Sequence, residues 1–392
     1  MTTSTVPGAA AGSATAGIDE HTFAWNGTAP TGVGAWFADG LRDRLLAAGY
    51  REREAPGPDV QVVLHHVDPQ RPRPYRRKAA PTFVVAIVAL PEPPGDVLRA
   101  GYPVLVRALA NLCVLLSEGP DGRAASFVTL EQGTYSVTRD PDDGGDGDDE
   151  FFTRVFERIE PLASSRLVIA NDFRADLPVE LRDGDEQTRQ IRRAGERLAA
   201  LDLLPAPFPI EDILPPRDLR HVKLLYGIGG LSYGNVSARR IGGAPSDIGP
   251  EFWMSASGVD KADLRVIGEH VLLVHGYDPD VDAMVLSVPP NVTPKRVSVD
   301  AIEHWKIYRE HPDVGAILHV HAWMDGVHAT EVNYPCGTLQ LADAVADLVR
   351  AEPDPAHAVV GQRNHGLTIT GPSLDEIFAR IDGRLVRNVP MD

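Results

Sequence analysis

Apolar residues recur along the first half of the chain with two different spacings. Residues 34–48 repeat them every three to four positions, which predicts an amphipathic helix. Residues 60–66 and 82–90 are β-branched runs that predict strands, and the second run is apolar throughout, as expected of a central strand. Residues 125–138 predict two strands that turn at Gly133.

The spacing of apolar residues predicts further helices and one more strand up to residue 201. Residues 96–116 predict one long buried helix, and residues 150–162 and 186–201 predict two more. A short strand is expected at 167–171, between the last two helices. This mixture of strands and helices predicts an α+β domain over residues 18–203, whose role the pattern does not indicate.

Two segments mark the domain limits. Residues 1–17 are small and uncharged and predict a disordered tail without the features of a signal peptide. Residues 204–216 are rich in proline, which is incompatible with a helix interior or a central strand and predicts an extended linker. We therefore expect a second domain over residues 217–392.

Length, charge and cysteine content narrow the class of protein. A chain of 392 residues exceeds what one core usually serves. A net charge of −17 disfavours binding to nucleic acids or to anionic membranes, and no apolar stretch is long enough to span a bilayer. With only two cysteines, Cys113 and Cys336, we expect reduced thiols and a cytoplasmic protein.

Candidate chemistry begins with two histidines at the end of an apolar strand over residues 315–321. His319 and His321 are two positions apart, so both imidazoles lie on one face of the strand. The pair indicates either half of a metal site or two hydrogen-bonded histidines in a polar cleft. By itself the spacing does not choose between them.

Two further residues strengthen the metal hypothesis. Asp300 opens a predicted helix, either as its N-cap or as a ligand, and shares a helix face with His304. His365 precedes Gly366 between two strand-like segments, in a turn suited to presenting a ligand. Three histidines and one carboxylate form a suitable ligand set for a catalytic metal.

Two glycine- and serine-containing segments are candidate anion cradles. One spans residues 229–239 and contains Asn235 and Ser237, and the other contains Ser257 and Gly258. Backbone N–H groups in such turns bind phosphate or carboxylate, although each segment alone is equally consistent with a plain tight turn.

Five stretches in this order resemble the class II aldolase/adducin family, whose members include sugar-phosphate aldolases and epimerases. The resemblance covers about residues 213–387 and is carried by residues 234–239, Ser257-Gly258, Ser298-Val299-Asp300 with His304, residues 311–321, and residues 364–367. It implies a three-layer α/β/α domain with a central, mainly antiparallel sheet. It also implies a small-molecule substrate and a homo-oligomer, usually a ring tetramer.

The resemblance further implies roles for individual residues. A divalent metal, zinc before Fe(II), Mn or Co, would be held by His319, His321 and His365 with Asp300. Asn235, Ser237, Ser257, Gly258 and Ser298 would bind the substrate, chiefly a phosphate on it. The expected reaction is aldolase-type C–C cleavage or epimerisation of a hydroxy-carbonyl compound through a metal-stabilised enediolate.

This sequence departs from the family at the loop that carries a catalytic tyrosine, because only 43 residues separate His321 from His365. Tyr334 is the candidate substitute, Glu331 is an additional candidate base, and Asp300 is the third catalytic candidate. Two alternatives remain open. One is a non-haem Fe(II) oxygenase built on the same three histidines, and the other is a non-catalytic, adducin-like interaction module.

Overall fold

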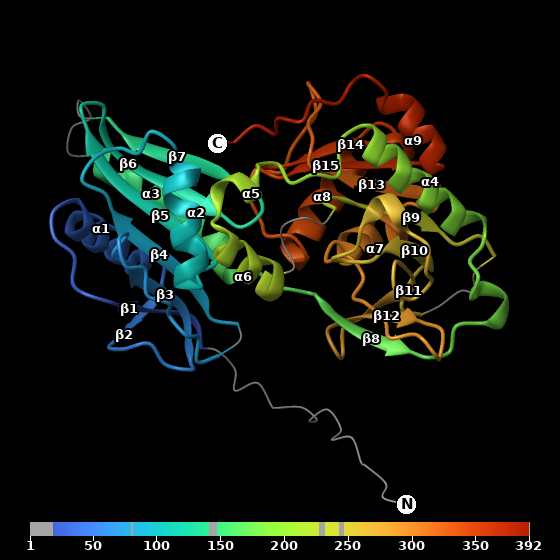
Figure 1. The fold of residues 1–392 in the computed structure, drawn as a ribbon, viewed down its shortest axis with the longest axis horizontal. Helices are drawn as coiled ribbons and strands as arrows, with labels where there is room; N and C mark the ends of the chain where they lie inside the picture. Colours follow the sequence, from blue (N-terminus) through green and yellow to red (C-terminus); the bar gives the residue numbers. More distant parts are fainter. Residues whose placement is uncertain (1–18, 80, 141–146, 227–231, 243–246, 392) are drawn as a thin grey trace, which may run out of the picture.

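The protein folds into two lobes, each built around one β-sheet (Figure 1). The computed structural model describes residues 19–79, 81–140, 147–226, 232–242 and 247–391. The predicted tail, residues 1–17, lies outside these ranges. In the described part of the chain, no helix is long and apolar enough to cross a membrane.

The first lobe contains a seven-stranded sheet with the order β2-β1-β3-β4-β5-β6-β7. The first five strands in this order run parallel, and β6 and β7 are antiparallel additions. The strands are β1 (Asp19–Asn26), β2 (Arg51–Arg53), β3 (Val60–His66), β4 (Phe83–Ala89), β5 (Leu112–Gly119), β6 (Gly122–Thr129) and β7 (Thr134–Arg139).

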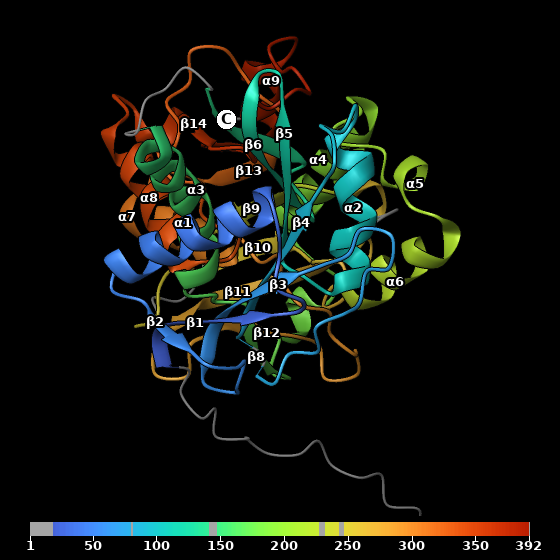
Figure 2. The ribbon, with the colours of Figure 1, turned by 90° about the vertical axis from the view of Figure 1, so that its left-hand side faces the viewer.

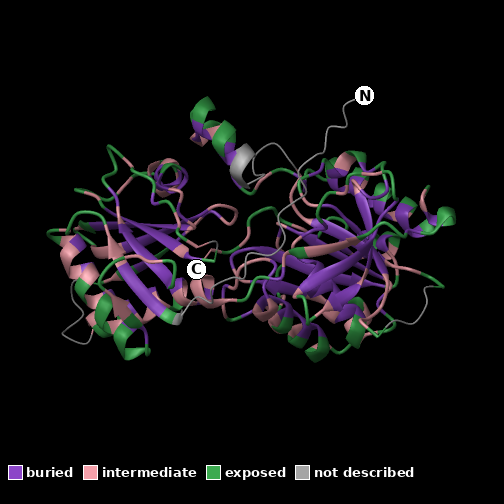
Figure 3. Cartoon of the chain, turned by 90° about the horizontal axis from the view of Figure 1, so that it is seen from below, coloured by how far each residue is buried: buried purple, intermediate pink, exposed green. Residues whose placement is uncertain are grey.

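Helices cover both faces of this sheet. Because side chains alternate along a strand, Val85 and Ile87 of β4 pack against the core beneath α1 (Val33–Ala47) and α3 (Gly147–Ser164). Val84 and Ala86 face the opposite core, which α2 (Val97–Ala108) covers. The all-apolar pattern of β4 therefore reflects burial on both sides, as Figure 3 shows for the strands of each lobe.

The predicted helix over residues 96–116 is wrong in its second half. Helix α2 ends at Ala108, Leu109 adopts a left-handed φ of 55°, and strand β5 begins at Leu112. The Asn111 side chain holds this turn by accepting a 2.9 Å hydrogen bond from the backbone N–H of Val84. A continuous apolar run fits a buried helix and a buried strand equally well, so its periodicity could not reveal the change.

The second lobe contains an eight-stranded sheet with the order β14-β15-β13-β9-β10-β11-β12-β8. All neighbours are antiparallel except β12 and β8. The strands are β8 (Ala170–Arg174), β9 (Asn235–Arg239), β10 (Phe252–Ser255), β11 (Val271–Asp278), β12 (Ala283–Ser287), β13 (Ala316–Val320), β14 (Val359–Gln362) and β15 (Gly366–Gly371).

Helices form a layer on either side of this second sheet. Helices α4 (Glu186–Ala200) and α9 (Leu374–Ile381) contact each other and the central strands. Helices α7 (Ala301–Glu310) and α8 (Leu339–Ala351) form the other layer. The short 3₁₀ helices are η1 (Val179–Leu181), η2 (Lys261–Asp263) and η3 (Pro355–His357). The predicted three-layer domain with a mainly antiparallel sheet is confirmed.

The chain passes between the lobes more than once. Strand β8 and helix α4 precede the proline-rich segment, yet both belong to the second lobe, where β8 pairs in parallel with β12 (Figure 1). The predicted boundary at residue 204 therefore does not coincide with the change of lobe, because β8 completes the edge of the second sheet.

The proline-rich segment then returns to the first lobe. It contains the short helix α5 (Ile210–Ile213) and leads into α6 (Pro216–Tyr226), so it is not a wholly extended linker. Phe208 packs edge-on against Tyr102 of α2 at 5.3 Å between ring centroids. The apolar side chains between the prolines account for this docking, since their burial stabilises the contact with α2.

The packing of α4 in the second lobe gives a stability prediction. A Cβ atom at Gly195 would overlap the carbonyl oxygen of Lys261, so we expect Gly195→Ala to lower the free energy of unfolding by about 1–3 kcal/mol. Gly95→Ala is the matched control, because a Cβ there meets no neighbour. Denaturant unfolding measures both variants, and equal losses would contradict the observed packing of α4.

Candidate metal centre and its pocket

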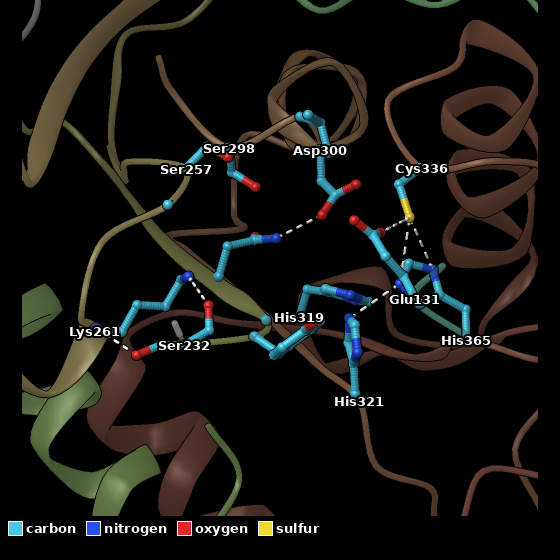
Figure 4. A pocket seen from close by; sticks show the side chains of 15 residues that line it. Glu131, Ser232, Ser257, Lys261, Ser298, Asp300, His319, His321, Cys336 and His365 are labelled. Carbon is cyan, nitrogen blue, oxygen red and sulfur yellow. Dashed lines mark hydrogen bonds between the residues drawn. The ribbon is translucent and has the colours of Figure 1, made fainter. Parts of the chain in front are cut away.

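Three histidines converge in the second lobe (Figure 4). His319 lies in β13, His321 directly follows the last residue of that strand, and His365 comes from the turn between β14 and β15. One ring nitrogen from each lies within 4.8 Å of the other two, and the Nε2 atoms of His321 and His365 are 3.0 Å apart. The spacing of two along a strand places the first pair, as the sequence predicted.

Local backbone geometry brings His365 to this pair. Asn364 adopts a left-handed φ of 58°, which turns the chain sharply between β14 and β15. A Cβ on the following residue, Gly366, would overlap the carbonyl oxygen of Val320, so glycine permits the close approach of this turn to β13. The antiparallel pairing of β13 with β15 then places His319 opposite Thr368.

The three imidazoles are suited to bind a cation. Burial lowers the pKa of His319 to about 4 and that of His365 to about 3, and it lowers the pKa of His321 well below its ordinary value, so all three are neutral at pH 7. His319 donates from Nδ1 to the carbonyl oxygen of Leu367 at 3.1 Å, which leaves Nε2 as the lone-pair nitrogen.

Two of the imidazole nitrogens are left without a hydrogen-bond partner in the described part of the protein. Among the described residues, His319 Nε2 and His321 Nδ1 are buried without a hydrogen-bond partner. Unpartnered buried polar atoms are costly, and neutral imidazole nitrogens are preferred ligands of zinc and related metals. The donor set therefore fits a divalent metal.

Asp300 lies in the same pocket but outside the compact set of three nitrogens. It precedes α7, yet its side chain makes no capping hydrogen bond, so the plain N-cap interpretation is wrong. Asn235 donates to Asp300 Oδ2 at 2.6 Å, while Asp300 Oδ1 has no partner among the described residues. Burial raises the pKa of Asp300, and nearby His365 opposes the shift.

The pocket is a cavity of about 120 Å³ that also contains most of the predicted substrate-binding residues. Asn235, Ser257, Gly258 and Ser298 line it. Lys261, which the sequence left open between a partner of an anionic substrate and a surface ion pair, adds a buried ammonium group that donates to the Ser232 carbonyl oxygen at 2.6 Å. Burial lowers the pKa of Lys261 to about 8, so most of this group still carries its positive charge at pH 7.

Three of the predicted site residues lie elsewhere. Ser237 is fully buried behind the pocket, where its hydroxyl bonds to His304 Nδ1 at 2.7 Å and to the Tyr308 hydroxyl at 2.8 Å. Tyr334 and Glu331 are not among the residues that line the pocket, and Glu331 is exposed. The loop that carries them instead directs Cys336 toward His365 (Figure 4).

Two pocket residues were not predicted from the sequence. Cys336 Sγ lies 3.3 Å from His365 Nε2 and 3.9 Å from a carboxylate oxygen of Glu131. Glu131 comes from the β6–β7 loop of the first lobe, so no local motif links it to the histidines. Gln132 and Asn333 hold this loop to the second lobe through two hydrogen bonds of 3.0 and 3.1 Å.

The environment of Glu131 alters its acidity. Burial, with a further contribution from the Asp300 carboxylate, raises the pKa of Glu131 to about 7. A carboxylic acid that titrates near neutral pH is suited to proton transfer. The first lobe therefore places a candidate acid or base beside the histidines.

Comparisons with known proteins agree with the predicted resemblance. Residues 220–331 match the family model of the Class II Aldolase and Adducin N-terminal domain. This match confirms the resemblance to the class II aldolase/adducin family in the C-terminal half. No curated protein sequence matches the chain.

Three solved structures resemble the C-terminal half, all at low identity. YgbL of Klebsiella pneumoniae, for which aldolase, epimerase and decarboxylase are the suggested activities, is 15% identical, with coverage of 52% of this chain and 92% of its own (TM-score 0.32). An aldolase II superfamily protein of Pseudomonas syringae is 19% identical, with coverage of 52% and 74% (TM-score 0.32). An L-fuculose 1-phosphate aldolase is 16% identical, with coverage of 53% and 92% (TM-score 0.31).

The raised pKa of Glu131 predicts a pH-dependent stability. The folded protein holds this proton up to about pH 7, whereas an unfolded glutamate loses it at about pH 4.3. The free energy of unfolding therefore falls as pH rises between these values, because only the unfolded state releases the proton. In metal-free protein, Glu131→Gln should raise the free energy of unfolding at pH 8 by about 1–3 kcal/mol, with little gain at pH 5.

Glu331→Gln is the matched control for this experiment, because the Glu331 side chain is exposed and does not line the pocket. Denaturant unfolding at both pH values in the presence of a chelator measures the effect. A gain for Glu131→Gln that does not change with pH would contradict a buried, titrating carboxyl group.

Proposed function

We propose that this protein is a metal-dependent enzyme of the class II aldolase type that cleaves, forms or epimerises a small hydroxy-carbonyl compound. The observation that carries the proposal is the set of three neutral histidines in one pocket, two of which, His319 and His321, have a buried nitrogen without a hydrogen-bond partner among the described residues. The family match over residues 220–331 supports it, because it covers two of the three histidines and Asp300.

His319, His321 and His365 would hold the metal, with the unpartnered Oδ1 of Asp300 as the nearby carboxylate. Zinc is the first candidate for this ligand set, and Fe(II), Mn and Co are the others. A divalent metal supplies Lewis-acid polarisation of a carbonyl or hydroxyl oxygen.

The side chains around the histidines have separate tasks in this proposal. Ser257, Ser298 and the Lys261 ammonium group would bind an anionic group of the substrate, such as a phosphate or carboxylate. Glu131 would exchange a proton with the substrate, because its pKa of about 7 allows both protonation states near neutral pH. Asp300 is the second candidate for proton transfer, while Tyr334 and Glu331 are not assigned a catalytic role.

Two further features remain proposals. One, from the resemblance, is assembly into a homo-oligomer, with a tetramer as the first expectation. The other is a cytoplasmic location, which is inferred from the low cysteine content and not from the resemblance. The non-haem Fe(II) oxygenase remains an alternative because three histidines and a carboxylate suit iron as well as zinc.

Elemental analysis tests the metal site directly. Untagged protein purified without chelator should contain about one equivalent of divalent metal per chain, and His321→Ala or His365→Ala should lose most of it because each removes one of three ligands. His357→Ala, at an exposed histidine paired with Asp354, should retain the metal.

The identity of the bound metal separates the candidate functions. Zinc would support the aldolase-type enzyme, whereas iron together with strictly oxygen-dependent turnover would favour the oxygenase. Wild-type protein that neither contains nor binds a divalent metal would overturn the proposal. The non-catalytic, adducin-like interaction module would then be the remaining hypothesis.

The anion cradle gives a separate prediction. Lys261→Met should weaken the binding of inorganic phosphate by about tenfold, because it removes a charged donor from the pocket while keeping the side-chain length. Lys295→Met, at an exposed position outside the pocket, is the matched control. Calorimetric titration measures both, and unchanged phosphate affinity in Lys261→Met would exclude this role.

A further inference from the structure

A second cavity of about 400 Å³ adjoins the histidine pocket at the junction of the two lobes. Thr82, Phe83 and Leu130 of the first lobe line it on one side, and Ile169 and Pro335 line it on the other. Glu131, Val299 and Cys336 line both this cavity and the histidine pocket. The two spaces are therefore adjacent, and these three residues border both of them.

Several polar side chains around the second cavity are already engaged within the protein. Arg77 donates to the Asn111 side chain at 2.9 Å, and the Thr82 hydroxyl donates to the Val60 carbonyl oxygen at 3.0 Å. Gln132 is paired with Asn333. These hydrogen bonds leave the apolar side chains as the main surface that this cavity offers to a ligand.

Apolar side chains line the rest of the cavity, and one of them is unusually exposed. The surface is contributed mainly by Phe83, Leu130, Leu162, Leu167, Ile169 and Val299. Leu167 has 52% of its surface exposed although it borders the cavity. Exposed apolar surface beside a polar reaction pocket is typical of a ligand-binding site.

From this arrangement we propose that the cavity between the lobes is the second compartment of the substrate site. It would hold an aromatic or branched aliphatic group attached to the hydroxy-carbonyl head, which would lie among the histidines. This inference rests on the proposed function and adds the substrate class: a head that binds a metal, joined to an apolar tail.

The sizes of the two spaces support this division. An engineered cavity of about 150 Å³ accommodates benzene, so a cavity of 400 Å³ is large enough for a substituted ring. The 120 Å³ histidine pocket is smaller and is lined mainly by polar side chains. The first lobe thus contributes substrate selection, in addition to the carboxyl group of Glu131.

Calorimetric titration of the zinc-loaded, full-length protein tests the proposal with two probes. Lactate and 3-phenyllactate share the 2-hydroxycarboxylate head and differ in the phenyl group. Burial of that ring in the cavity should make 3-phenyllactate bind about 10- to 100-fold more tightly than lactate. Equal affinities would overturn the proposal.

A pair of surface variants tests whether the preference for 3-phenyllactate over lactate arises in the second cavity. Leu167→Asp places a charge at the edge of the cavity and should reduce the preference for 3-phenyllactate to less than about threefold. Val179→Asp is the matched control, since Val179 is 70% exposed and does not line the cavity. A preference that persists in Leu167→Asp would also overturn the proposal.

A third variant and the metal content distinguish a failure of the proposed function from a failure of the second compartment alone. Ala163→Trp fills the cavity from α3 and should also remove the preference for 3-phenyllactate. If the protein cannot be loaded with zinc, the proposed function fails. If loaded protein binds neither acid, or both equally, only the second compartment is rejected.

Discussion

The candidate site depends on the burial of three imidazoles, two of which have a nitrogen without a hydrogen-bond partner among the described residues. Removal from water lowers the pKa of each ring and keeps it neutral, so the nitrogens present lone pairs instead of charges. Antiparallel pairing of β13 with β15 fixes their positions. The fold thus maintains unpartnered buried nitrogens whose cost a bound cation would offset.

The second constraint is the way in which the chain connects the lobes. Strand β8 and helix α4 enter the second lobe before residues 208–222 return to the first (Figure 2 views the molecule with the first lobe in front of the second). Near the C-terminus, Met391 packs against the core of the first lobe. These crossings connect the two lobes at several points along the chain. They explain how the β6–β7 loop of the first lobe can place Glu131 beside the histidines of the second lobe.

Local charge in the pocket differs from the charge of the whole chain. The net charge of −17 would disfavour an anionic substrate, yet the buried Lys261 lines the pocket together with Ser257 and Ser298. Because buried charges act at short range with little screening, the local arrangement outweighs the average over the surface. Two carboxyl groups, Glu131 and Asp300, line the same pocket, and the Asp300 carboxylate adds to the burial that raises the pKa of Glu131.

The sequence by itself determined those features that depend on spacing within one element. The period of two placed His319 and His321 on one face of a strand, and helical spacing located α1, α4 and α7 closely. It could not divide residues 96–116 into α2 and β5, because burial on all sides removes the periodic signal. Only the tertiary structure decided that Glu131 and Cys336 enter the pocket, that Ser237 lies behind it, and that a second cavity adjoins it. These facts arise from contacts between segments far apart in the chain, and no local pattern of side chains records such contacts.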